Sequence, residues 1–264
     1  MEVTYYSQSN LKSIAEELSN KILNSRENGT YSSEPFQHIV VDNFLPIDFA
    51  NDCLNTFPDT ESKVWEHSNN EDVEIKLRTN WKSEFDIPDG GILNAIRIFN
   101  SSYFLNAMSE SLGIPKLMPD PYFSGGGLNA TVRGGLLDVH VDGNYHDASG
   151  LNRRVNAILY LNPGWESSWG GEFGIYDNTG DKCLKEVAPL FNRLVIFDTH
   201  DKSFHGLPNP LNFPEGNARK SIILYYYTKD SRPQSLISVD EPHSALWKKK
   251  NWTDKNGNVT RNFN

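Results

Sequence analysis

The chain has very few cysteines. Cys53 and Cys183 are the only two among its 264 residues, which excludes a framework of disulfide bonds and favours a reducing compartment. The first residues also lack the basic and apolar segments of a secretory signal. We therefore expect a cytoplasmic protein.

Long hydrophobic runs and an excess of basic residues are also missing. The most apolar stretches, residues 157–161 and 221–228, are too short to span a bilayer. The 25 Lys and Arg residues are outnumbered by 34 Asp and Glu, which gives a formal net charge of −9. This balance argues against nucleic acid and against an anionic membrane surface as partners. Nothing in the sequence indicates an oligomeric state.

The first part of the chain has mainly helical patterns. Apolar residues recur at helical spacing in residues 11–23, 46–57 and 91–112, and residues 36–41 have the composition of a strand. The polar stretch 61–88 fits neither pattern clearly. We predict that residues 1–118 form a mainly helical support region.

The pattern changes in the second half of the chain. Short runs rich in aliphatic and aromatic residues follow one another without intervening helices, at residues 136–141, 155–161, 172–176, 194–198 and 221–228. Such a series is typical of a double-sheet jelly roll. The predicted fold is therefore α+β: a double-stranded β-helix (jelly-roll) core at residues 119–230 with the N-terminal helices packed against it. Residues 231–264 are mostly polar and predict a solvated extension, and we expect residues 1–264 to form a single domain.

A metal site is predicted from two histidines and one aspartate. His140 and Asp142 lie two residues apart in a β-prone run, so their side chains share one face of the strand. His205 follows the run 194–198 and precedes a glycine, which lets its side chain leave the end of a strand. Two histidines and one carboxylate on one side of an ion are typical of non-haem Fe(II) oxygenases. His200 and His146 are alternative ligands, and we favour His205.

Polar residues in neighbouring β-prone runs could bind a dicarboxylic cosubstrate. Arg219 could bind a carboxylate with two hydrogen bonds, and alternation lets only one of Arg219 and Lys220 face inward. With Arg219 inside, Ser221 shares its face. Tyr160 and Asn156 lie four residues apart on one face of another run, and both offer hydrogen bonds.

Residues 143–154 follow the predicted metal ligands directly. They are mostly polar and contain two glycines, Gly143 and Gly150, so little apolar surface would hold them down. We predict that this segment is a lid that becomes fully ordered only with substrate. Arg153 and Arg154 at its end could meet an anionic group, but an exposed pair at the start of a strand is the simpler expectation.

Residues 125–228 resemble the catalytic core of 2-oxoglutarate- and Fe(II)-dependent oxygenases of the prolyl 4-hydroxylase-like type. The resemblance rests on His140-Val141-Asp142, on His205-Gly206 and on residues 157–162, 169–173, 191–197 and 219–226. One departure is the segment 207–217, which is longer than in many prolyl hydroxylases.

The resemblance implies a complete set of site residues. In the family the two histidines and the aspartate bind iron, which corresponds here to His140, Asp142 and His205. The late basic residue, Arg219, would bind the distal carboxylate of 2-oxoglutarate, and Tyr160 would assist it. The implied cofactors are Fe(II) and 2-oxoglutarate, with ascorbate as a further candidate.

The reaction implied is hydroxylation of an aliphatic C–H bond with O2. A peptidyl proline is the first expectation for the substrate, and a free amino acid, a sugar or another small metabolite is the alternative, because the fold carries little information on substrate. Two other classes stay open: a zinc-dependent cupin-like enzyme with the same three ligands, and a non-catalytic binding protein that keeps the fold.

Overall fold

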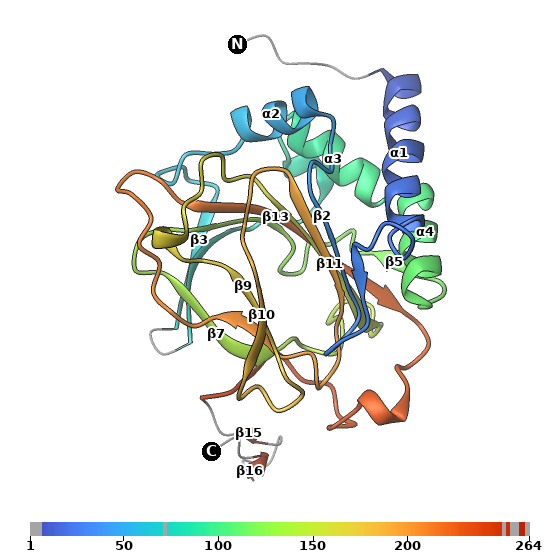
Figure 1. Ribbon diagram of the computed structural model, residues 1–264, viewed down its shortest axis with the longest axis vertical. Helices are drawn as coiled ribbons and strands as arrows, with labels where there is room; N and C mark the ends of the chain where they lie inside the picture. The colour runs from blue at the N-terminus through green and yellow to red at the C-terminus, as the bar shows by residue number, and fades with distance from the viewer. Residues whose placement is uncertain (1–6, 71–72, 250–251, 254–258, 262–264) are drawn as a thin grey trace.

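Four helices precede most of the strands. The computed structural model describes residues 7–70, 73–249, 252–253 and 259–261 (Figure 1). The helices are α1 (Gln8–Leu23), α2 (Ile47–Asn55), α3 (Gly91–Phe99) and α4 (Ser102–Leu112). They confirm the three helical patterns, the last of which is divided into α3 and α4 at Asn100 and Ser101. None of the helices in the described part of the chain is long and apolar enough to cross a membrane.

The strands form one large antiparallel sheet and a separate small one. Along the main path the order is β1-β2-β11-β8-β13-β6-β4-β7-β12-β9-β10, and β3, β5 and β14 pair with β4, β13 and β7 respectively. In chain order the strands are β1 (Tyr31–Ser32), β2 (His38–Val41), β3 (Trp65–Asn70), β4 (Glu74–Thr79), β5 (Met118–Pro119), β6 (Gly127–Thr131), β7 (Leu136–Val141), β8 (Asn152–Tyr160), β9 (Phe173–Tyr176), β10 (Cys183–Val187), β11 (Arg193–Asp198), β12 (His205–Leu207), β13 (Arg219–Thr228) and β14 (Leu246–Trp247), with β15 (Trp252–Thr253) and β16 (Val259–Arg261) in the small sheet.

The large sheet curls into two halves that enclose a cavity. One half contains β2, β11, β8, β13 and β6, and the other contains β4, β7, β12, β9 and β10. Residues from both halves line the same cavity. Together with the four helices, this arrangement confirms the predicted α+β fold with a jelly-roll core.

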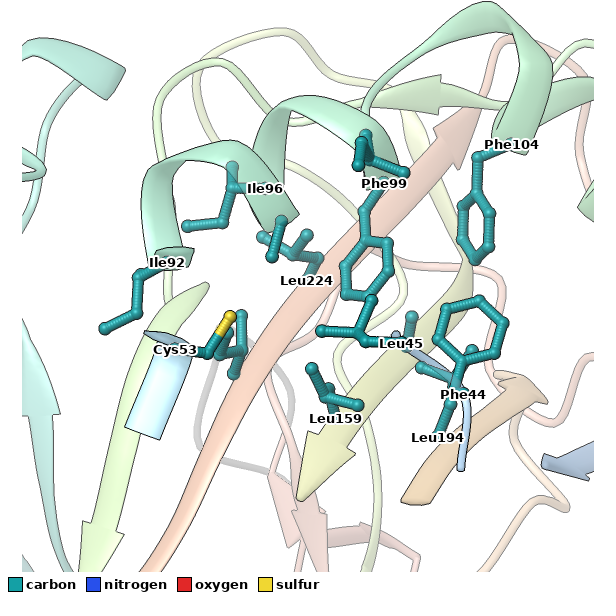
Figure 2. Close-up of a cluster of buried hydrophobic side chains, with 14 of the residues drawn as sticks. Phe44, Leu45, Cys53, Ile92, Ile96, Phe99, Phe104, Leu159, Leu194 and Leu224 are labelled. Atoms are coloured by element: carbon teal, nitrogen blue, oxygen red, sulfur yellow. The ribbon is translucent and has the colours of Figure 1, made fainter. Parts of the chain in front are cut away.

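The main core lies between the helices and the first half of the sheet (Figures 1 and 2). Residues of strands alternate, so that Leu159, Leu194 and Leu224 face the helices. They pack there against fully buried aromatic rings, among them those of Phe44 and Phe104. The helices thus support the outer face of β8, β11 and β13 and leave the inner face for the cavity.

The sheet extends beyond the predicted core of residues 119–230 on both sides. From the N-terminal part, β2 pairs with β11, and β4 lies between β6 and β7. The stretch 61–88 therefore contains the hairpin of β3 and β4. The face of β4 that lines the cavity carries the charged residues Glu74, Lys76 and Arg78.

Part of the predicted solvated C-terminal extension packs against the sheet, so the prediction is wrong for Leu246 and Trp247. Leu246 is buried, and β14 pairs with β7 through Leu246 opposite Val141 and Trp247 opposite His140. Two apolar residues in a polar stretch suffice to add this short strand beside the end of β7, beyond the residues that pair with β4. After residue 249, most of the extension lies outside the described residues.

Candidate active site

The three predicted metal ligands meet at the cavity. His140 and Asp142 lie at and just after the end of β7, and β12 begins with His205 opposite His140. One ligand atom from each residue lies within 4.8 Å of the others. The Nε2 atoms of His140 and His205 are 3.7 and 3.5 Å from the Asp142 carboxylate oxygens. These separations suit one ion, since two ligands about 2.1 Å from a metal lie roughly 3–4 Å apart.

Backbone carbonyl groups fix both imidazole rings. His140 Nδ1 is 2.8 Å from the carbonyl oxygen of Asp138, and His205 Nδ1 is 2.9 Å from that of Ser203. Each Nδ1 therefore carries the proton and donates it to the carbonyl, which leaves the Nε2 lone pair for a metal. Burial lowers the pKa of His205 to about 4, so that its ring is neutral, as a metal ligand must be.

Asp142 is oriented by two residues of β8. Asn156 Nδ2 donates a hydrogen bond of 2.7 Å to Asp142 Oδ2, and Arg153 Nη2 is 3.3 Å from Oδ1. Burial alone would raise the pKa of Asp142, but Arg153 and the two histidines outweigh it and hold the pKa well below its usual range. The carboxylate is thus charged and held in place. Asn156 was predicted to contact a cosubstrate; it lines the cavity, and the structure shows its amide bound to the metal ligand Asp142.

The expectation that Arg153 and Arg154 are exposed is wrong. The guanidinium of Arg153 stacks 3.5 Å above the ring of Tyr225, and its Nε donates to Asn156 Oδ1. Arg154 is buried near Asp198, with 3.8 Å between charged atoms. Their partners lie on other strands, which a local pattern does not show.

The alternative histidines lie elsewhere. His200 packs edge-on against Phe36, and its Nδ1 accepts a hydrogen bond from the backbone of Lys202. His146 is buried against Asp120, with 3.1 Å between Nε2 and the carboxylate. Neither joins the metal cluster, and the assignment of His205 is confirmed.

A second polar group of the cavity is built around Arg219. Arg219 is 7% exposed and donates hydrogen bonds to the carbonyl of Gly171 (2.6 Å) and to the hydroxyl of Tyr160 (3.1 Å). Burial raises the pKa of Tyr160 although Arg219 opposes this, so the hydroxyl keeps its proton and can donate it to a ligand. Ser221 lies opposite Tyr160 in the sheet register and lines the same cavity. Lys220 instead faces the helices, with its Nζ 5.6 Å from the ring centre of Phe57.

Gly171, the second residue of the glycine pair that precedes β9, must be glycine because of its backbone angle and its closeness to Arg219. Its φ is +89°, and a Cβ there would lie 2.9 Å from Cδ of Arg219. Only glycine allows this backbone to approach the arginine so closely.

One further polar residue of the cavity was missed by sequence reasoning. Asn129 on β6 is paired with Ser221, and its Oδ1 is buried without a hydrogen-bond partner among the described residues. Its position beside the Arg219 group could have been anticipated only from the strand order. A polar ligand in the cavity would satisfy this atom.

The donor set fits Fe(II) with 2-oxoglutarate. Two imidazoles and one carboxylate on one side of an ion leave other coordination positions open. Arg219 and Tyr160 supply donors suited to the distal carboxylate of a dicarboxylic acid. The cavity that contains both groups has a volume of about 490 Å³.

The predicted lid is more firmly held than its composition indicated. The backbone N–H of Asn144 donates to the carbonyl of His243, and the Asn144 side chain accepts from the N–H of His243. His146 is buried against Asp120. The premise that little holds residues 143–154 down is therefore wrong, and opening of this segment stays a prediction.

Comparison with known proteins agrees with this chemistry. Residues 126–227 match the model of the 2OG-Fe(II) oxygenase superfamily. With the complete ligand set, this match identifies residues 126–227 as the core of a 2-oxoglutarate- and Fe(II)-dependent oxygenase. The oxygenase prediction is thereby favoured over the zinc-dependent and non-catalytic alternatives.

Relatives with curated functions match only part of the chain. The prolyl 3-hydroxylase OGFOD1 of Mus musculus is 34% identical over 104 residues, which cover 38% of this chain and 19% of that protein. The Xenopus laevis protein of the same name is 34% identical over 86 residues, or 31% of this chain and 16% of that protein. The chain thus matches less than a fifth of the length of these relatives.

Solved structures show the same fold. A prolyl hydroxylase from Trichoplax adhaerens, in complex with a peptide fragment of the hypoxia inducible factor oxygen degradation domain, has a TM-score of 0.53 at 21% identity, covering 84% of this chain and 94% of that one. A prolyl-4-hydroxylase from Pseudomonas putida has a TM-score of 0.52 at 18% identity, covering 83% of this chain and all of that one.

Proposed function

We propose that the protein hydroxylates a prolyl residue of a peptide or protein. The observation that carries this proposal is the 34% identity to a prolyl 3-hydroxylase over 104 residues. The sequence resemblance to prolyl 4-hydroxylases supports the same substrate ring but a different carbon atom. Both positions carry aliphatic C–H bonds, and the product identifies which one reacts.

Different residues of the site bind the metal and the cosubstrate. Bound Fe(II) and 2-oxoglutarate supply the oxidising chemistry with O2. His140, Asp142 and His205 hold the metal from one side, and Asn156 keeps the Asp142 carboxylate from rotating. Arg219 would fix the far end of 2-oxoglutarate, so that the reacting groups are positioned before the substrate arrives.

Apolar residues keep water away from this centre. Phe173 and Phe197 pack against the ring of His205, with centroids 5.3 and 4.8 Å away. Ile158 belongs to the same apolar cluster as Phe173 and Phe197 and also lines the cavity. A dry environment strengthens the charge contacts of the carboxylates and suppresses side reactions.

The shape of the cavity supports an extended substrate. Arg78, Ser124 and Gly125 line both the main cavity and a neighbouring hollow of about 370 Å³. A peptide could place one residue beside the metal and continue into this hollow. A small metabolite would use only the first space.

An array of proline-containing peptides tests the proposal. Each peptide is incubated with the protein, Fe(II), 2-oxoglutarate and O2, next to a matched peptide with alanine in place of proline and next to free proline. We expect a mass gain of one oxygen on proline peptides alone, together with succinate. Hydroxylation of free proline without hydroxylation of any proline peptide would contradict the proposal.

We also propose that ascorbate supports turnover and that the protein acts in the cytoplasm. Cys53 and Cys183 are unpaired, which suits a reducing compartment. Omission of ascorbate from a long incubation tests the first point, and fractionation of cells tests the second.

A further inference from the structure

Part of the C-terminal extension forms a wall of the active-site cavity. Strand β14 places Trp247 opposite His140 on the edge of β7. Trp247 and its neighbours Ser244 and Ala245 line the cavity that contains the metal ligands. These residues lie outside the stretch 126–227 that matches the superfamily.

The indole of Trp247 covers a metal ligand. Its ring centre lies 4.6 Å from that of His140, and the two planes are inclined by 31°. Trp247 is only half-buried, so part of the indole is left to line the cavity. Because His140 directs Nε2 toward the metal, the indole lies beside the place where a substrate must react.

A buried carboxylate anchors this wall. Asp201 is fully buried and accepts hydrogen bonds from the backbone N–H groups of Ser238 (2.6 Å) and Val239 (3.0 Å). It also contacts Arg232 Nη1 at 3.1 Å and His243 Nε2 at 3.3 Å. Four donors around one carboxylate fix the course of the chain that leads to β14.

The segment after the metal ligands fits closely against the same wall. A Cβ at Gly143 would lie 2.9 Å from the carbonyl oxygen of His243, so only glycine allows this approach. Asn144 adds two hydrogen bonds to the backbone of His243. The wall is thus held from both sides, and Trp247 is fixed before a substrate binds.

We propose that Trp247 is a substrate-contacting residue that selects a prolyl ring beside the metal, and that Asp201 is the residue that positions it. This inference rests on the proposed function. An indole offers a flat apolar surface with no atom that competes for the metal, and the C–H groups of a pyrrolidine ring can pack against it. Aromatic residues in such positions contribute much of the binding energy at recognition sites.

Peptide affinity tests the inference without turnover. Dissociation constants of a proline peptide are measured with Mn(II) in place of iron and with 2-oxoglutarate, for wild type, Trp247→Phe and Trp247→Ala. We expect a loss of about tenfold for Trp247→Ala and a smaller one for Trp247→Phe. Affinities for Mn(II) and 2-oxoglutarate should stay within about twofold. Tyr103→Ala, an exposed aromatic on α4, is the control and should bind peptide as wild type does.

A double variant tests the role of Asp201. Asp201→Asn should weaken peptide binding, and its addition to Trp247→Ala should cause little further loss, since both changes act on the same contact. Fully additive losses would contradict the positioning role. Thermal unfolding of each variant shows whether it is folded at the temperature of the measurement.

Two outcomes would overturn the inference. Equal peptide affinity in wild type and Trp247→Ala would show that the indole does not contact the substrate. A parallel loss of Mn(II) affinity would show that Trp247 serves only to hold His140. Failure of wild type to bind any proline peptide would instead contradict the proposed function, and with it the prolyl ring as the ligand of Trp247.

Discussion

The contact between Arg219 and the distal carboxylate of 2-oxoglutarate can be tested by removing the guanidinium. Arg219 is 7% exposed and is held by the Gly171 carbonyl and the Tyr160 hydroxyl. Truncating one partner of such a buried charged pair costs about 2–5 kcal/mol. At about 1.4 kcal/mol for each factor of ten, Arg219→Ala should weaken 2-oxoglutarate binding by roughly 30-fold to a few thousand-fold.

Related variants show how much of the binding of 2-oxoglutarate depends on the charge of Arg219 and how much on the arrangement of its donors. Arg219→Lys keeps the charge but loses the planar pair of donors, so its loss should lie between wild type and Arg219→Ala. Tyr160→Phe removes one hydroxyl and should cost about 1 kcal/mol, or roughly fivefold. Lys220→Ala is the matched control, because Lys220 packs toward Phe57 on the other face of β13.

The assay is succinate release as a function of 2-oxoglutarate concentration, with direct titration of the Mn(II)-loaded protein as the binding measurement. Thermal unfolding accompanies both, since Arg219→Ala also leaves the Gly171 carbonyl without its donor. The reasoning is refuted if Arg219→Ala binds 2-oxoglutarate within twofold of wild type, or if Lys220→Ala shows the large loss.

Three further predictions concern the metal and the core. His205→Ala should abolish Fe(II) binding in a metal titration while His200→Ala retains it; the reverse result would show that the third ligand is misassigned. Asn156→Ala frees the Asp142 carboxylate and should weaken metal binding by about 10- to 100-fold, and an unchanged titration would contradict the orienting role. Burial raises the pKa of Asp198 to about 6, so the folded protein holds a proton that the unfolded chain releases near pH 4, and stability is lost as pH rises through about 6. Asp198→Asn should therefore gain stability relative to wild type between about pH 4 and pH 7.5, by about 2 kcal/mol in denaturant unfolding, and a pH-independent difference would disprove this.

The parts of the site that sequence could predict are those with local patterns. The spacing of His140 and Asp142 in a β-prone run indicates a shared face, and alternation shows that only one of Arg219 and Lys220 faces inward. These inferences need only the geometry of a single strand. The jelly roll itself follows from a series of short strands without helices between them.

Features that depend on residues far away in the sequence were not predicted. A charged residue at the start of a strand usually contacts solvent, yet Arg153 stacks on Tyr225 and pairs with Asp142. Its environment is set by other segments of the sheet. Asn156 was placed on the correct face, but its hydrogen bond to Asp142 was not anticipated, because the direction of a face does not specify what lies across it.

The C-terminal wall formed by β14 was not predicted from the sequence, for another reason. Leu246 and Trp247 stand alone in a polar stretch, without a repeating pattern that would predict a strand. Their pairing with β7 depends on the end of β7 that β4 leaves unpaired and on the anchor at Asp201. Both features belong to distant parts of the chain, so the residues next to Leu246 and Trp247 in the sequence do not reveal them.

The most direct test of oxygenase chemistry follows the two atoms of O2. The protein is incubated with Fe(II), 2-oxoglutarate, a proline peptide and ¹⁸O-labelled O2, next to the Asp142→Ala variant. We predict that one labelled atom appears in succinate and the other in hydroxyproline, in equal amounts, and that Asp142→Ala forms neither product. Iron-independent turnover, or a hydroxyl group that carries oxygen from water without labelled succinate, would contradict the assignment of this site.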